Sequence, residues 1–198
     1  MILKNYNRGF TLIEMMVSVS IFAIVMAVST ASILGIIDAN YKAQALKSVM
    51  DNLNLALEEM SRQIGDGITY HCGTTGVYTT VQDCGHINAP LLDPQSQIVF
   101  EPRHGTASPS DQVIYGRNVD ASGRGWIEKS FDAGTTFFPI TAPEIDIKNL
   151  KFYVHGSDPL DRKQPRVFMI IQGTASIKDK VKTEFFIQTS ASQSYIDG

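Results

Sequence analysis

Residues 8–37 read RGFTLIEMMVSVSIFAIVMAVSTASILGII, and this stretch decides how the rest of the chain is organised. After Gly9 there are 28 consecutive residues that contain a single ionisable side chain, Glu14. A helix of about 20 apolar residues is already long enough to span the hydrocarbon core of a bilayer. The sequence therefore predicts a transmembrane helix near the N-terminus, covering residues 10–37.

The polar segment MILKNYNRG precedes the apolar run and is predicted to be a leader peptide, residues 1–9. A secretory signal has an apolar core of about 7–15 residues that is followed by a cleavage site. The apolar run here is too long for that, so we predict cleavage in front of it, between Gly9 and Phe10. Because Lys4 and Arg8 precede the helix, the positive-inside rule places the leader in the cytoplasm and the remainder outside.

The composition limits the classes of function. The chain has 198 residues and a net charge of −3, and removing residues 1–9 leaves 15 basic and 20 acidic side chains. This balance gives no basic face for general nucleic-acid binding. The sequence contains no GxSxG, HExxH or Walker-type motif and no cofactor fingerprint. We therefore predict that the protein is not an enzyme and holds no cofactor.

From Asp38 onward the helical pattern changes from uniformly apolar to amphipathic. Seven apolar residues recur at steps of three and four and form one stripe: Leu46, Val49, Met50, Leu53, Leu57, Met60 and Ile64. No Pro interrupts residues 10–64, and Gly65-Asp66-Gly67 is predicted to end the helix. The sequence thus predicts one continuous helix over residues 10–64, with its outer half packed on a head domain.

Residues 97–198 are predicted to form an antiparallel β-sheet head domain. In one run Leu150, Phe152 and Val154 alternate with polar or half-polar residues, which is the period of a half-buried strand. Short connections favour antiparallel neighbours, and Lys178-Asp179-Lys180 is typical of a hairpin turn. The predicted strands are QIVFE, QVIYGRN, WIEKSF, EIDIKNLKFYVHG, RVFMIIQGTASI and KTEFFIQTSAS. One face of this sheet is expected to cover the helix stripe.

Residues 65–96 are predicted to be a connecting loop with at most one short strand, at residues 77–81. Cys72 and Cys84 enclose about a dozen residues of it, and an extracytoplasmic setting favours a disulfide between them. Zinc binding is an alternative because His71 and His86 flank the cysteines, but this spacing matches no standard zinc site. Free thiols are the third alternative. We predict the disulfide and no metal.

Residues 8–14, Arg-Gly-Phe-Thr-Leu-Ile-Glu, resemble the type IV prepilin signal, in which a basic leader ends in Gly and is followed by FTLIE. The resemblance implies an α+β, type IV pilin-like lollipop: a long N-terminal helix, transmembrane in its apolar half, packed on the antiparallel β-sheet head. It also implies that a prepilin peptidase cleaves between Gly9 and Phe10 and that Phe10 becomes N-methylated.

The resemblance gives Glu14 a role in subunit assembly, as the partner of the Phe10 α-ammonium on a neighbouring subunit. A carboxylate in a membrane helix costs about 2.5 kcal/mol or more near the bilayer centre, so it is a functional hypothesis by default. The alternative is that Glu14 serves only its own helix, because an anion near a helix N-terminus is favoured by the helix dipole.

Two further segments resemble particular members of the pilin group. LNLALEEMSRQI, followed by a Gly-rich break, is similar to the end of the first helix in J-type pseudopilins and W-type minor pilins. FFIQTSASQSYID is similar to their C-terminal ending, with Ser194 where a basic residue often stands. The membrane helix lacks the Pro common in major pilins, and the cysteines come early. These features favour a minor pilin or pseudopilin over a major subunit.

The expected function is that of a structural subunit that initiates or caps a type IV pilus or a type II secretion pseudopilus. Its expected partners are the prepilin peptidase, other pilin or pseudopilin subunits and the inner-membrane assembly platform. It is expected as a single-pass inner-membrane protein and then in the filament. The alternative is a tip-located binding or adhesin pilin whose loop 65–96 contacts DNA, a surface or a substrate. Nucleic acid would be a partner only of a competence pilin.

Overall fold

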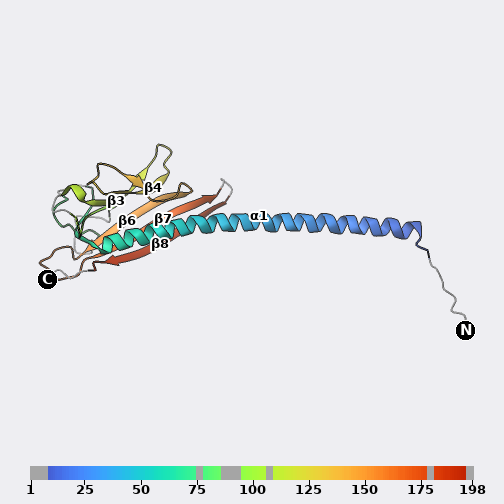
Figure 1. Cartoon of the computed structure of the whole chain (residues 1–198), viewed down its shortest axis with the longest axis horizontal. Helices are drawn as coiled ribbons and strands as arrows, with labels where there is room; N and C mark the ends of the chain where they lie inside the picture. The colour runs from blue at the N-terminus through green and yellow to red at the C-terminus, as the bar shows by residue number, and fades with distance from the viewer. Residues whose placement is uncertain (1–8, 75–77, 86–94, 106–108, 178–180, 195–198) are drawn as a thin grey trace, which may run out of the picture. The chain divides into compact units, whose positions relative to one another are not determined.

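The computed structural model describes residues 9–74, 78–85, 95–105, 109–177 and 181–194. Helix α1 (Leu12–Gly65) is followed by antiparallel strands, which confirms the predicted α+β class (Figure 1). The chain divides into two compact units, residues 1–44 and residues 45–198. The first contains the N-terminal part of α1, and the second contains the remainder of α1 together with all of the strands.

The part of α1 in the first unit is apolar on all sides. Among the described residues, α1 is the one helix that is long and apolar enough to cross a membrane. Its large apolar side chains are exposed around the whole circumference, from Leu12 and Ile13 to Ile36 and Ile37. A helix that is hydrophobic all round belongs either in a protein core or in lipid, and here no protein core covers it within the unit.

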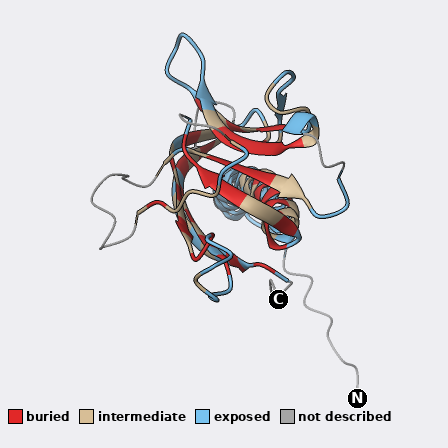
Figure 2. Cartoon of the chain, turned by 90° about the vertical axis from the view of Figure 1, so that its left-hand side faces the viewer, coloured by how far each residue is buried: buried red, intermediate tan, exposed pale blue. Residues whose placement is uncertain are grey.

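Residues 45–65 of α1 pack through the predicted apolar stripe. Leu53, Met60 and Ile64 are completely buried, Val49 and Leu57 nearly so, and Leu46 and Met50 are partly buried against the same core. Figure 2 shows the buried segments of the strands gathered around this part of the helix, with the exposed segments in the outer loops. The prediction of the stripe is confirmed.

The strands form two antiparallel sheets, whereas the sequence predicts one. The first sheet has the order β1 (Gly67–Cys72), β2 (Gln97–Pro102), β3 (Val113–Val119), β4 (Gly125–Ser130) and β5 (Phe138–Pro139). The second sheet has the order β6 (Ile145–His155), β7 (Arg166–Ile177) and β8 (Val181–Ser192). A short 3-10 helix, η1 (Pro109–Asp111), precedes β3. Neighbouring strands follow one another in the chain, as short connections favour.

The segment predicted as a connecting loop contains strand β1, which pairs with β2. Three consecutive residues of β1, Tyr70 to Cys72, are buried, so the strand shows no polar–apolar alternation by which it could be recognised. The short strand predicted at residues 77–81 is wrong, since residues 78–81 form a turn and irregular chain. Val77 and the predicted hairpin turn at residues 178–180 lie outside the described residues.

Residues outside α1 donate hydrogen bonds to its last carbonyl groups, which have no partner within the helix. The hydroxyl of Tyr70 lies 2.6 Å from the carbonyl oxygen of Ile64 and 2.7 Å from that of Gly67. The backbone N–H of Ser194 donates to the carbonyl oxygen of Gly65 at 2.7 Å. The end of the helix is therefore held by β1 and by the residues that follow β8.

A buried lysine joins α1 to strand β4. The side chain of Lys129 is 2% exposed, and its Nζ lies 2.8 Å from Oε1 of Glu59, which is 45% exposed. Nζ also lies 3.8 Å from the ring centroid of Phe131 and 5.4 Å from that of Tyr115. The Tyr115 hydroxyl donates to Gln63 Oε1, and Gln63 Nε2 donates to Glu59. Burial lowers the pKa of Lys129, and its hydrogen bond with Glu59 opposes this shift.

We expect Glu59→Gln to lower the free energy of unfolding by about 2–3 kcal/mol, because the buried Lys129 cation then lacks its anion. The loss stays below that of a fully buried pair because water reaches Glu59. Lys129→Met should change stability by less than about 1 kcal/mol, because it removes the buried charge itself. Urea unfolding of the full-length protein in detergent, followed by the fluorescence of Trp126, measures both.

Glu58→Gln is the matched control, since Glu58 is exposed on the same helix, and it should change stability by less than about 0.5 kcal/mol. The loss of stability in Glu59→Gln should become smaller as the pH rises through the pKa of Lys129, which burial lowers. Above that pKa the folded protein has released the Lys129 proton, so no unpaired cation remains buried. Equal losses in Glu58→Gln and Glu59→Gln would show that the ion pair does not hold the helix to β4.

Candidate functional site

The residues predicted for processing and assembly lie at the start of α1. Because the helix begins at Leu12, Thr11 is its N-cap and Glu14 is its third residue. Glu14 Oε2 accepts hydrogen bonds from the Thr11 backbone N–H at 2.9 Å and from the Thr11 hydroxyl at 2.8 Å. The Glu14 backbone N–H donates to Thr11 Oγ1 at 3.3 Å. This reciprocal pattern is a capping box, which satisfies backbone donors that the helix leaves unpaired.

The capping box gives Glu14 a role in its own helix. The sequence offers such a role as the alternative, through the helix dipole, but the hydrogen bonds of a capping box are not among the predictions. Its signal is present there, because Thr-x-x-Glu in front of an apolar run is the usual pattern of a capping box. Both bonds from Thr11 go to Oε2, and among the described residues no hydrogen bond to Glu14 Oε1 is found. The carboxylate therefore caps its own helix with one oxygen and keeps the other as an acceptor.

Gly9 and Phe10 precede the helix and are exposed, and Phe10 is 85% exposed. A Cβ atom added to Gly9 would meet no atom within 4 Å, so the fold of this chain gives no steric reason for glycine there. A requirement for Gly9 must then come from another molecule that approaches the backbone closely. Residues 1–8 of the predicted leader lie outside the described residues.

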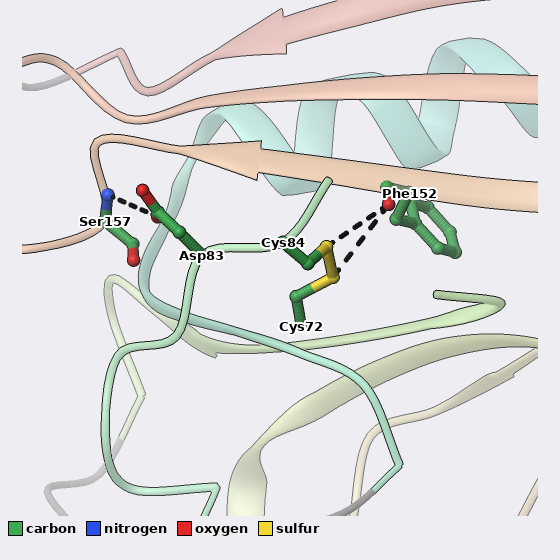
Figure 3. Close-up of a disulfide and its surroundings, with 5 residues drawn as sticks. All are labelled: Cys72, Asp83, Cys84, Phe152 and Ser157. Atoms are coloured by element: carbon green, nitrogen blue, oxygen red, sulfur yellow. Dashed lines mark hydrogen bonds between the residues drawn. A yellow bond between two sulfur atoms is a disulfide. The ribbon is translucent and has the colours of Figure 1, made fainter. Parts of the chain in front are cut away.

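Cys72 and Cys84 form a disulfide with a Cα–Cα distance of 5.9 Å (Figure 3), which confirms the predicted pairing. Both residues are completely buried. Cys72 ends β1 in the first sheet, whereas Cys84 forms an isolated antiparallel bridge with Val154 of β6 in the second sheet. The disulfide thus links the two sheets, in addition to closing the loop as predicted.

The chain around Cys84 runs along the edge of β6. Cys84 and Val154 exchange two backbone hydrogen bonds, of 3.1 and 3.2 Å. The carboxylate of Asp83 accepts a hydrogen bond from the backbone N–H of Ser157 at 3.0 Å (Figure 3). It also accepts one from the backbone N–H of Gly156 at 2.9 Å. The carbonyl oxygen of Phe152 lies 3.3 Å from Cys84 Sγ, as a close contact, because a disulfide sulfur has no proton to donate.

The zinc alternative requires thiolate ligands, and the disulfide leaves none at Cys72 and Cys84. His71 is buried, its Nδ1 lies 2.8 Å from the carbonyl oxygen of Thr80, and its ring meets that of Tyr78 edge-on. His86 lies outside the described residues. The described residues contain no group of three or more His, Cys, Asp or Glu side chains that could hold a metal ion.

Residues 4–30 match the family model described as the prokaryotic N-terminal methylation motif, the signature of type IV pilins. Searches of curated proteins and of solved structures returned no match. The motif and the exposed apolar helix, which is the one candidate span in the described residues, indicate an N-terminal membrane anchor. With the antiparallel sheets that follow, the chain has the N-terminal signature and the α+β architecture of type IV pilin-like proteins. The motif implies processing by a prepilin peptidase and assembly with other pilins, and the family is structural.

Replacing both cysteines by serine should lower the free energy of unfolding by roughly 3 kcal/mol, the value for closing a loop of this length. Urea unfolding followed by Trp126 fluorescence measures the loss. Dithiothreitol should destabilise the wild-type protein by a similar amount and leave the double variant unchanged. Non-reducing mass analysis of the purified protein should show a mass two hydrogen atoms below that of the dithiol. Stoichiometric zinc in the purified protein would contradict this assignment.

Proposed function

We propose that the chain is a minor pilin or pseudopilin, a subunit that initiates or caps assembly of a type IV pilus or type II secretion pseudopilus. The observation that carries the proposal is the methylation motif at residues 4–30, which leads directly into an apolar helix. In this proposal residues 1–9 are the leader, residues 10–37 span the inner membrane and the β-strands lie outside it. The disulfide supports that orientation, because disulfides persist in extracytoplasmic compartments.

The described part of the segment 65–96 supports a structural role over a tip-binding role. Cys84 and Gln95 both form bridges with β6, and Asp83 binds the backbone that follows it. These residues complete the fold of the chain and leave few groups in the described part of the segment for a ligand. We therefore keep the assembly subunit as the proposed function.

Glu14 is proposed to bind the N-methylated ammonium group of Phe10 on the neighbouring subunit. Cleavage after Gly9 would create that cation within a few residues of the capping box. Oε2 is already used by Thr11, and Oε1 is the oxygen left for the ammonium. In the low dielectric of a helix bundle, such a pair is costly to break because one charge then remains without a partner.

Gly9→Val should block removal of the leader while leaving insertion into the membrane intact, because a branched Cβ keeps the scissile backbone away from the peptidase. Gly35→Val is the matched control, since a Cβ atom added to Gly35 would also meet no atom within 4 Å, but Gly35 lies inside the apolar helix. It should be processed normally. N-terminal mass analysis of the membrane fraction reads both. A wild-type chain that starts at Met1 would rule out the proposed processing.

Glu14→Ala should be inserted and largely processed but should be lost from sheared filaments or cross-linked pseudopilin complexes, relative to its abundance in the membrane. Thr11→Ala is the control that separates the two roles of Glu14: it removes the capping box, at about 1 kcal/mol, but keeps the carboxylate. It should be incorporated normally, and Glu14→Asp should be intermediate. If Thr11→Ala fails as severely as Glu14→Ala, Glu14 serves only its own helix.

A further inference from the structure

The second sheet has two edges of opposite character. At β6 the outer edge is covered, because Cys84 bridges Val154 and the Phe152 N–H donates to the Gln95 carbonyl at 2.7 Å. At the other margin, β8 is the outermost strand of the sheet (Figure 1). Among the described residues, no strand pairs with the outer edge of β8 along its 12 residues.

The hydrogen bonds after β8 show which backbone groups face outward. The Gln193 N–H donates to the Pro165 carbonyl on the β7 side, whereas the Ser194 N–H donates to Gly65 on the opposite side. Backbone groups of successive residues in a strand point to alternate sides. The even-numbered residues of β8, including Phe186, Gln188 and Ser190, therefore direct their N–H and C=O groups away from β7.

A groove runs along this edge of β8. It has a volume of about 770 Å³, and one wall is lined by the β8 residues from Ile187 to Ser192. The other wall is α1, with Asn54, Glu58 and Ser61 along it. The outward N–H and C=O groups of Gln188 and Ser190 thus lie at a groove that runs beside a helix.

Charged side chains lie at one end of this edge, where Lys182 and Glu184 are exposed, and the end of α1 covers the other end through the bond from Ser194 to Gly65. Between these ends the edge lacks the features that usually prevent strand addition. Natural edge strands are protected by charged side chains, Pro, bulges or a covering segment. Residues 185–192, FFIQTSAS, contain no charge, no Pro and no Gly, and Phe186 is 60% exposed. An uncharged strand of this kind pairs readily with another extended chain.

We propose that the outer edge of β8 docks an extended segment of a neighbouring pilin-like subunit, which adds a fourth strand to the second sheet. The proposal rests on the proposed assembly function and names the surface and the form of the partner. Outward N–H and C=O groups recur at every second residue, about 7 Å apart, and an extended polypeptide is the ligand that matches this spacing. The groove is lined mainly by polar residues, and the side facing β8 carries the charged residues Glu58, Arg62 and Asp66, which suits a partner segment with polar residues on that side.

Ser190→Pro removes one outward N–H without removing a hydrogen bond to β7, so it should block docking and leave the fold intact. Ser190→Lys adds the charge that edge strands use against pairing. The matched control is Gln172→Lys, an exposed position on the central strand β7. Trp126 fluorescence in urea should show the same stability for all three full-length variants. Incorporation into assemblies should fall about tenfold or more for the Ser190 variants and stay normal for Gln172→Lys.

Amide hydrogen exchange provides the second measurement. Between the free protein in detergent and the assembled protein, exchange at the outward amides of Phe186, Gln188 and Ser190 should slow about tenfold or more. The amides of Ile187 and Thr189 already bond to β7 and should be slow in both states. Normal incorporation of Ser190→Pro with unchanged exchange would overturn the docking proposal, while the loss of Glu14→Ala from the same assemblies would leave the proposed function standing.

A Ser190→Cys variant separates the two proposals if the wild-type protein enters no filament. Cross-linking in membranes, followed by mass spectrometry, should join Ser190→Cys to an extended segment of another pilin-like subunit, whereas Gln172→Cys should not react. Such a cross-link would support the docking surface. In that case only the proposal that the protein is part of a filament would be wrong. A cross-link solely to proteins that are not pilin-like, or no cross-link, would overturn the proposed partner.

Discussion

The structure depends on residues 10–37, a run of 28 residues in which Glu14 is the one ionisable side chain. Hydrocarbon offers no hydrogen bonds, so a chain that enters it must pair its own backbone groups, and a helix does this within one segment. In the first unit the apolar side chains of α1 cover all sides. In the second unit one side of α1 packs on the core of the domain, and the apolar residues on that side form the stripe from Leu46 to Ile64. One helix thus follows two patterns because its surroundings change.

The second unit is held together by contacts between residues that are far apart in the chain. The disulfide ties β1 of the first sheet to the edge of the second. Lys129 of β4 binds Glu59 of α1, and the Ser194 N–H closes the end of that helix. A domain of this size buries a limited core, so each such link is a sizeable part of its stability. In the second sheet, these contacts cover the edge at β6, whereas no strand of the described residues pairs with the edge at β8.

The N-terminal motif meets two demands with few residues. Thr11 and Glu14 form a capping box that starts the helix, a role that needs nothing outside the chain. The same carboxylate is the one ionisable group in the apolar run, where a charge is costly without a partner. Gly9 differs from both, since nothing in the fold requires a glycine there. The proposed reason for a glycine at this position is the close approach of a processing peptidase.

The sequence by itself determined the features that repeat at short range. It determined the long helix, its change from apolar to striped at Asp38, most of the strands after residue 96 and the processing motif, because each is encoded by neighbouring residues. The pairing of Cys72 with Cys84 could also be predicted from the sequence, since the chain has only two cysteines. Tertiary structure decided the division into two sheets, strand β1, the partner of Lys129 and the open edge of β8. These four features depend on which distant segments of the chain come into contact. A strand that is buried on both faces has no alternating pattern in its sequence, and no local pattern shows which strand edge stays unpaired.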